Sequence, residues 1–256
     1  MSYQNRVVPS DLDILCEACG YTLTGLPVSG QCPECGESIA ISTTASPRHA
    51  PVWEKSMGTS AFTSTALSVM NSPRGFFKTL ALEEHPRSRR FRTFSVMLLA
   101  IISCVAVTLH YNWAIAFWGF SPLTFSAIGI SLAIGAVGAK LVLLFGLLLA
   151  KPIAWLTTLE SNFWGYRMPR PRVQRALDYH AIHTLPAAIV ILLVVIAHRV
   201  LLSLSIVSGA DGITYLYTLS AVTVVCVGYV FYTYTLAMRA IMFANNRVET
   251  SAAKEP

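Results

Sequence analysis

Hydrophobic and polar positions divide the chain into two regions near Phe91. The long apolar runs all lie after this residue, whereas the preceding part alternates between short polar and apolar stretches. An α-helix needs about 20 mostly apolar residues to cross a bilayer. Runs that meet or approach this length lie near residues 93–112, 122–150, 185–207 and 213–238. The pattern predicts an all-α membrane protein, a four-helix transmembrane bundle that follows a small N-terminal module.

Composition supports membrane insertion. The chain is 54% hydrophobic and only 12% charged, and its mean hydropathy is +0.55, whereas soluble domains contain about 25% charged residues. No signal peptide is visible in the first 90 residues, because no apolar core precedes a small-residue cleavage site.

Basic residues predict the orientation. Six Lys and Arg residues lie between Arg74 and Arg92, and five lie in loop 151–183, whereas segments 111–121 and 208–212 contain none. Cytoplasmic loops carry an excess of Lys and Arg. We therefore expect both termini and the central loop to be cytoplasmic, as in a multi-pass protein of a bacterial inner membrane. This use of the net charge of +6 argues against nucleic-acid binding.

The polar part predicts further boundaries. Residues 1–45 form the module, and residues 46–70 are rich in Ser, Thr, Ala and Pro and predict a linker, with a short helix near Ser60–Met70 as an alternative for its end. The membrane domain covers 71–242, and residues 243–256 are expected to be a disordered tail.

Two amphipathic segments flank the spans. Ser72 and Pro73 suit the start of a helix, whose apolar face lies either on the bilayer surface or on the ends of the spans. Residues 151–165 place Trp155, Leu159 and Phe163 on one face, which predicts a second surface helix.

Four cysteines form the most specific motif of the chain. Cys16 and Cys19 form one C-x-x-C pair, and Cys32 and Cys35 form another after twelve intervening residues. Thiolates with this spacing supply the four ligands of a tetrahedral Zn site. Two disulfides are the alternative, which a reducing compartment disfavours. We expect a two-knuckle ribbon, with β-prone stretches after each pair, that folds only around zinc.

The ribbon is acidic. Five acids and no Lys or Arg lie between Asp11 and Ile41, and a zinc ion held by four thiolates adds about two negative charges. Nucleic-acid readers are basic, so the ribbon favours a structural role or a protein partner.

Two basic positions fall inside apolar runs. Lys140 lies in the second run, and His198 and Arg199 lie in the third, with no acid inside any run to pair with them. A charge at this depth is costly, so it suggests a functional site. These residues could bind an anionic lipid headgroup or substrate. The alternative is that the long side chains extend to the membrane surface.

Asp178, His180 and His183 precede the third run. The two histidines would share a helix face and could bind a metal with Asp178, but an interfacial polar cluster suits the spacing better. The second run carries small residues at every fourth position, which indicates a close helix contact. These are Ala127, Ser131, Gly135 and Ala139.

The membrane region resembles the Yip family of multi-span proteins. The resemblance lies in Asn71-Ser72-Pro73-Arg74-Gly75-Phe76-Phe77 and in Ala176-Leu177-Asp178-Tyr179-His180-Ala181 through Pro186. It covers residues 71–242 and implies a five-span domain, where four spans are counted here and residues 151–165 would replace the missing element. The cysteine segment is similar to a short zinc ribbon on many bacterial proteins, especially planctomycete ones, which implies an adaptor.

Short catalytic motifs are missing from the sequence: it contains no nucleophile elbow, phosphate-binding glycine loop or H-E-x-x-H. The first hypothesis is a non-enzymatic protein that organises membrane or partner proteins, and a homo-oligomer is compatible with it. The alternatives are a transporter-like or lipid-binding protein that uses Lys140 and Arg199, and a membrane enzyme acting on lipid.

Overall fold

The computed structural model describes residues 8–10, 13–44, 48–83, 85–117, 125–204 and 212–245. Two compact units make up the chain. The ribbon unit comprises Met1–Arg89, Lys151–Tyr179 and Thr235–Pro256, and the bundle unit comprises Arg90–Ala150 and His180–Tyr234.

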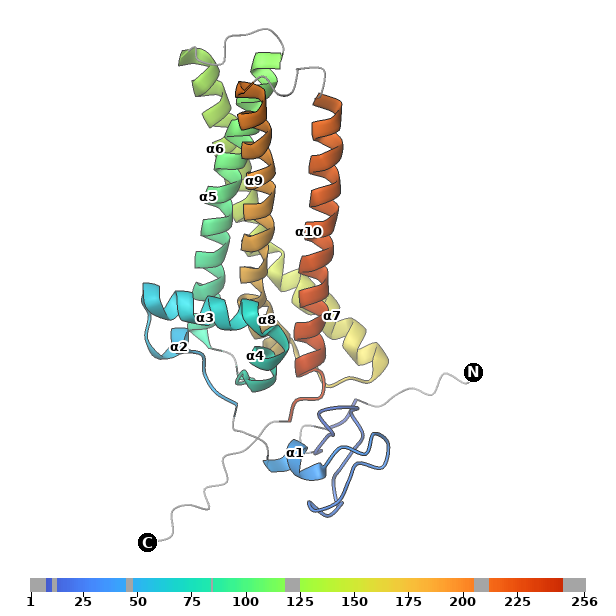
Figure 1. Ribbon diagram of the computed structural model, residues 1–256. Helices are drawn as coiled ribbons and strands as arrows, with labels where there is room; N and C mark the ends of the chain where they lie inside the picture. The colour runs from blue at the N-terminus through green and yellow to red at the C-terminus, as the bar shows by residue number, and fades with distance from the viewer. Residues whose placement is uncertain are drawn as a thin grey trace. The chain divides into compact units, whose positions relative to one another are not determined.

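Helices dominate the described residues, which contain isolated β-bridges but no strand. Figure 1 shows these helices with their labels. In chain order, the elements are α1 (Ile39–Thr44), α2 (Val52–Lys55), α3 (Thr59–Asn71), α4 (Pro73–Thr79), α5 (Pro86–Phe117), α6 (Phe125–Leu148), α7 (Ala150–Trp164), α8 (Arg170–His180), the short 3-10 helix η1 (Ala181–His183), α9 (Thr184–Ser203) and α10 (Gly212–Ile241).

Four helical segments in the described part of the chain are long and apolar enough to span a membrane, which confirms the predicted four-helix bundle. Their apolar side chains are largely exposed on the bundle unit, as expected of a surface that contacts lipid. The bounds differ from the predicted ones mainly at the start of α5, because the basic residues before the first apolar run continue the same helix. The end predicted at residue 207 for the third span lies outside the described residues.

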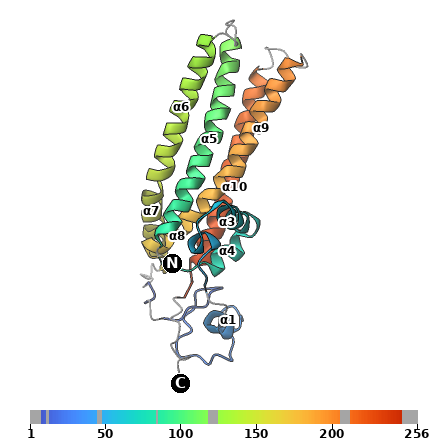
Figure 2. The ribbon, with the colours of Figure 1, turned by 90° about the vertical axis from the view of Figure 1, so that its left-hand side faces the viewer.

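Helices α5 and α6 run side by side (Figures 1 and 2), and glycines bring their backbones close together. A Cβ atom on Gly135 would lie 2.1 Å from Thr108 Oγ1 and 2.8 Å from the backbone oxygen of Cys104. A Cβ atom on Gly146 would lie 2.7 Å from Val96 Cγ1. The small-residue stripe of α6 therefore packs against α5, as the sequence predicts.

We expect Gly135→Ala to destabilise the α5–α6 contact by about 1–3 kcal/mol, because the new methyl group overpacks it. Gly129→Ala is the matched control, since Gly129 lies on the same helix and a Cβ atom added there would meet nothing within 4 Å. It should stabilise the helix slightly through its better helix propensity. Steric trapping or denaturant unfolding in micelles measures both changes. Equal effects of the two substitutions would contradict this packing.

Residues 48–70 contain two packed helices where a linker was predicted. Trp53 and Glu54 of α2 are buried, as are Ala61, Thr65 and Val69 of α3. The backbone N–H of Trp53 donates to Thr65 Oγ1 at 3.1 Å, and its indole N–H donates to the Arg87 oxygen at 2.7 Å. The alternative of a helix near Ser60–Met70 agrees with α3. Small and hydroxyl residues can therefore form a packed helix when a buried aromatic residue anchors it.

Helix α4 packs against protein. Phe77 is fully buried, and the ring of Phe76 meets the ring of Tyr179 edge-on with centroids 5.4 Å apart. The carbonyl groups of Phe77 and Leu80 accept hydrogen bonds from Arg48. Helix α4 thus packs within the ribbon unit, and its predicted contact with the bilayer surface or with the ends of the spans stays a prediction.

Helix α7 presents its apolar side to the outside. Trp155, Leu159 and Phe163 are 50%, 47% and 64% exposed, whereas the small side chains of Ala154 and Ser161 are buried. An exposed apolar face on a protein with spanning helices suits contact with the membrane surface. The predicted second amphipathic helix is present.

A buried ion pair connects α2 to α8. Arg175 Nη2 donates to Glu54 Oε2 at 2.6 Å, and the hydroxyl of Tyr179 donates to Glu54 Oε1 at 2.6 Å. The side chains of Glu54 and Arg175 are 1% and 3% exposed. Arg87 donates to the backbone oxygen of Glu54. Because a buried charge needs a partner, this network holds α2 and the start of α5 on α8.

Candidate metal centre

The four cysteines of the ribbon converge on one point. Their sulfur atoms all lie within 4.8 Å of one another, and in the described part of the chain they form the one group of three or more residues able to hold a metal ion. The Sγ atoms of Cys16 and Cys35 are 3.5 Å apart, and those of Cys19 and Cys32 are 3.6 Å apart. A tetrahedral zinc site with 2.3 Å bonds places its sulfurs about 3.8 Å apart, whereas a disulfide needs about 2.05 Å. The geometry suits a metal ion.

Two equivalent turns position the thiols. The Cys16 N–H donates to the Tyr21 oxygen and the Gly20 N–H donates to the Cys16 oxygen, both at 2.8 Å. Sixteen residues later, the Cys32 N–H donates to the Glu37 oxygen at 2.8 Å and the Gly36 N–H donates to the Cys32 oxygen at 2.9 Å. We call residues 15–22 the first knuckle and residues 31–38 the second knuckle.

Each knuckle contains a glycine directly after its second cysteine, where the chain turns with positive φ. The φ angles of Gly20 and Gly36 are 84° and 72°, which side chains with a Cβ rarely adopt. The antiparallel bridges Leu15–Thr22 and Gln31–Ser38 close the knuckles. The stretch from Ile39 onward, predicted to be β-prone, forms helix α1 instead.

The thiols differ in acidity because their surroundings differ. Burial raises the pKa of the Cys19 thiol to about 12. Burial also opposes ionisation of Cys32, but the backbone N–H groups of Cys35 and Glu34 outweigh it and lower the pKa of Cys32 to about 7. The thiolate is the form that binds a metal, so a metal ion bound here would displace protons from the thiols.

The ribbon has a minimal apolar core. Cys16, Leu23, Cys32 and Ile39 are buried, and Leu26 packs against them. Two of these four belong to the group that could hold a metal ion, so little apolar area remains to offset the conformational entropy of about 30 ordered residues. A metal ion bound there would add folding free energy.

The first knuckle binds the segment that follows α10. The Asn245 side chain accepts from the Leu15 N–H and donates to the Leu15 oxygen, each at 2.8 Å, and it donates to the Ser42 oxygen at 3.2 Å. The ring of Phe243 covers Gly20, where a Cβ would lie 2.4 Å from Phe243 Cε1. Residues 243–245, predicted to begin a disordered tail, are an ordered part of the ribbon contact. Residues 246–256 lie outside the described residues.

Arginines complete this contact. Arg167 donates to the Ser10 and Asp13 oxygens at 2.6 and 2.8 Å, and to Asn245 Oδ1 at 3.1 Å. On the other side of the knuckle, Arg48 Nη2 pairs with Glu17 Oε1 at 3.0 Å. Glu17, the acid of the first knuckle, thus pairs with a basic residue of its own chain.

We expect Asn245→Ala to detach the first knuckle from residues 243–245, which follow α10. It leaves the buried backbone groups of Leu15 without their partner, at a cost of about 1–3 kcal/mol for each unsatisfied group. Hydrogen exchange at residues 13–23 should accelerate while the metal stays bound. The control Asn71→Ala removes an exposed amide in the same unit and should leave the ribbon unchanged. Unchanged exchange in Asn245→Ala would contradict the contact.

The bundle unit separates the two basic residues that were predicted to share an anion site. Gly146 of α6 faces Val96 of α5, and Gly135 of α6 faces Cys104 of α5. Lys140 lies between the two glycines on α6, so it lies beside the part of α5 between Val96 and Cys104. Arg199 Nη2 instead donates to Asn112 Oδ1 at 3.1 Å. Asn112, which contacts Arg199, lies at least eight residues along α5 from the part beside Lys140, a distance of about 12 Å at 1.5 Å per residue. Lys140 is exposed and Arg199 is half-buried.

Arg199 belongs to a polar cluster from three helices. The ring of His198 stacks on Tyr215 with centroids 4.0 Å apart, and the Tyr215 hydroxyl forms a hydrogen bond of 2.9 Å with His110 Nδ1. We call His110, Asn112, His198, Arg199 and Tyr215 the bundle-end cluster. Arg199 lies four residues before the end of α9 at Ser203, about 6 Å along the helix, so it is closer to a helix end than the predicted span implied.

Asp178, His180 and His183 are all buried, and the rings of His180 and His183 contact each other with centroids 5.3 Å apart. Asp178 accepts from Ser88 Oγ at 2.7 Å and from Gln174 Nε2 at 3.2 Å. In the bundle unit, His180 Nε2 lies 3.1 Å from Thr233 Oγ1 and His183 Nδ1 lies 3.0 Å from the Tyr229 hydroxyl. These contacts secure α8 and α9, and no described group of three metal ligands includes them.

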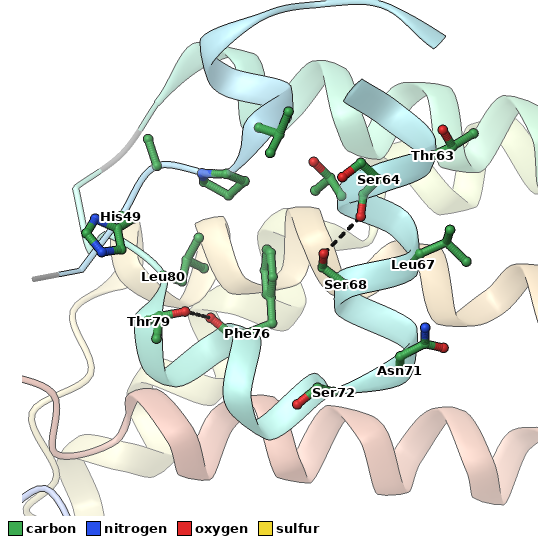
Figure 3. Close-up of a pocket in the computed structure, with 14 residues that line it drawn as sticks. His49, Thr63, Ser64, Leu67, Ser68, Asn71, Ser72, Phe76, Thr79 and Leu80 are labelled. Carbon is green, nitrogen blue, oxygen red and sulfur yellow. Dashed lines mark hydrogen bonds between the residues drawn. The ribbon is translucent and has the colours of Figure 1, made fainter. Parts of the chain in front are cut away.

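A groove of about 780 Å³ opens on the ribbon unit between α3, α4 and residues 49–52. Its wall carries hydroxyl groups, and Figure 3 shows that Ser68 and Thr79 turn theirs to their own helices, to the oxygens of Ser64 and Phe76 at 2.9 and 3.2 Å. His49 is the one titratable side chain on the lining. The groove therefore offers space but few free polar groups for chemistry.

The four thiols are evident from their spacing in the sequence. The residues that contact the first knuckle or the positions just before it are not, namely Arg48, Arg167, Phe243 and Asn245. Nor is the ion pair of Glu54 with Arg175, which joins α2 to α8. Only the isolated acid Glu54 within a polar stretch hinted at a buried partner. Comparison with protein-family models, with curated proteins and with solved structures finds no match for this chain.

Proposed function

We propose that this chain is a non-enzymatic membrane protein that uses a structural zinc ribbon as a cytoplasmic docking module for a protein partner. The observation that carries the proposal is the closed ligand set, four cysteine sulfurs within 4.8 Å. Catalytic zinc sites keep one position open for water or substrate, whereas structural sites are filled by four protein ligands. The thiolate donors favour zinc over Mg²⁺ and Ca²⁺.

The surface of the ribbon supports docking over nucleic-acid binding. Glu34 and Glu37 are exposed on the second knuckle, and Val28 and Ile41 add exposed apolar side chains. An acidic surface with apolar positions repels phosphate backbones and suits a protein. The cytoplasmic orientation follows from the arginine-rich segments and agrees with the need for reduced thiols. The Yip resemblance of residues 71–242 fits a membrane-organising role and is part of this proposal.

A photo-crosslinking experiment in membranes of the source cells tests the docking role. Crosslinking residues replace Val28 or Ile41 on the ribbon, and Ser64 on α3 is the exposed control position outside it. A discrete adduct is expected at the ribbon positions and should disappear when Cys16→Ser and Cys32→Ser unfold the ribbon. Adducts that persist without the four-thiol site, or that form equally at Ser64, would refute docking through the ribbon.

A second candidate function is anion binding in the membrane, and the bundle-end cluster favours it. The described residues of the bundle unit contain no Asp or Glu, and the guanidinium of Arg199 donates to the neutral amide of Asn112. A guanidinium binds phosphate through two parallel hydrogen bonds. Lys140 is not needed for this site.

Native mass spectrometry with phosphatidylglycerol tests this candidate. Arg199→Gln should reduce lipid retention, whereas Lys140→Gln should leave it unchanged. Inorganic phosphate added as a competitor distinguishes a headgroup site from a site for the free anion. Equal retention in Arg199→Gln and the unmodified protein would remove the candidate.

A further inference from the structure

The two knuckles of the ribbon have the same backbone but different surroundings. With an offset of sixteen residues, Cys16, Cys19 and Gly20 correspond to Cys32, Cys35 and Gly36, and the hydrogen bonds that close each turn are matched. The first knuckle is covered, since Leu15 is fully buried and Gly20 lies under Phe243. On the second knuckle, Gln31 is exposed and a Cβ at Gly36 would meet nothing within 4 Å.

The contacts of the first knuckle show how the outer backbone edge and the glycine of a knuckle are bound. In an antiparallel pair, alternate residues point their N–H and C=O groups away from the partner strand. Leu15 presents its two groups in this way, and the carboxamide of Asn245 caps both of them at 2.8 Å. Phe243, two residues earlier, places its ring over the glycine that ends the turn. A Phe-x-Asn segment therefore fills a knuckle.

The second knuckle presents the same backbone groups at Gln31. Its bridge uses the Cys32 N–H with the Glu37 oxygen and the Ile39 N–H with the Gly30 oxygen, so the N–H and C=O of Gln31 face outward like those of Leu15. Two exposed acids, Glu34 and Glu37, flank the uncovered Gly36. Four thiolates around one zinc ion would add to the negative charge of this surface.

We infer that the second knuckle is the docking surface for a basic segment of another protein, one that places an aromatic ring on Gly36 and a carboxamide on the backbone of Gln31. This inference rests on the proposed docking function and specifies its surface and partner chemistry. The aromatic ring and the carboxamide follow from Phe243 and Asn245, and the positive charge follows from Glu34 and Glu37. The Phe-x-Asn sequence occurs once in this chain, at 243–245, and it is engaged at the first knuckle, so the occupant comes from a different chain.

A peptide that copies residues 239–247 serves as the probe, because it carries Phe243 and Asn245 between two arginines. Binding to the full-length, metal-loaded protein is measured by microscale thermophoresis, and hydrogen exchange locates the bound peptide. We expect new protection at residues 31–38. Protection confined to residues 15–22 would show exchange with the protein's own segment and overturn the inference, as would the absence of binding.

Matched variants separate docking from folding. Gly36→Asn and Gly25→Asn both introduce a side chain that tolerates positive φ at glycines with open surroundings and φ of 72° and 84°. Gly36→Asn should weaken peptide binding about tenfold or more, and so should the double substitution of Glu34→Lys with Glu37→Lys. Gly25→Asn should bind the peptide with unchanged affinity, and all variants should keep the metal content of the unmodified protein. Equal affinity of Gly36→Asn and Gly25→Asn would overturn the inference. If crosslinks from Val28 or Ile41 persist in that case, docking through the ribbon stands and only its assignment to the second knuckle fails.

Discussion

Removal of the metal is expected to unfold the ribbon over residues 13–44 and to release residues 243–245 while the spanning helices stay intact. Structural zinc contributes roughly 10–16 kcal/mol to the folding of zinc-finger peptides, and besides two cysteines the buried apolar side chains of residues 13–44 are Leu15, Leu23 and Ile39. Without a bound metal ion, the four thiols lose the coordination bonds that would connect the two knuckles. The folded ribbon then loses the free energy that offsets its conformational entropy.

Hydrogen exchange before and after a strong chelator measures this effect. Backbone amides of the knuckles should become unprotected, and amides of α5, α6, α9 and α10 should keep their protection. Cys16→Ser should reproduce the chelator effect. Cys104→Ser and Cys226→Ser are matched controls, because these cysteines lie in α5 and α10 and belong to no metal group among the described residues. A ribbon that stays protected without metal would contradict the structural role of the site.

Glu54→Ala is expected to destabilise the packing of α2 on α8 by about 3–5 kcal/mol, the usual cost of removing one partner of a buried ion pair. Arg175 would keep its charge in a position that is 3% exposed, and the Tyr179 hydroxyl would lose its acceptor. The hydrogen bond from Arg87 to the backbone oxygen of residue 54 would remain, because the substitution removes only the side chain. This is the largest effect we expect from a single substitution outside the metal site.

Faster hydrogen exchange across α2 and α8, together with a lower unfolding temperature in detergent, would show the loss. Glu34→Ala removes an exposed acid and should change neither quantity. A double replacement of Glu54 and Arg175 by Leu should recover part of the stability, because it removes both buried charges. If Glu54→Ala behaves like Glu34→Ala, the ion pair does not hold the helices together.

The spanning helices and the thiol cluster could be predicted because their signals are local. A run of about 20 apolar residues has few alternatives to a transmembrane helix. Two C-x-x-C turns need only a short loop between them to meet at one ion. The close contact of α6 with α5 could also be predicted in part, since small residues every fourth position leave room for a neighbouring backbone.

The tertiary structure decided which distant residues meet. Glu54 and Arg175 are separated by 121 positions, and Leu15 and Asn245 by 230, so no local spacing links them. For the same reason residues 48–70 resemble a linker until Trp53 and Thr65 are seen to pack, and Lys140 and Arg199 suggest one site until their levels on α5 are compared. By itself the sequence determined what each segment can form, because backbone periodicity and ligand spacing are properties of neighbouring residues. Asn245 is buried against Leu15 and Gly36 is left uncovered only in the folded chain, because contacts between distant residues decide which positions are buried.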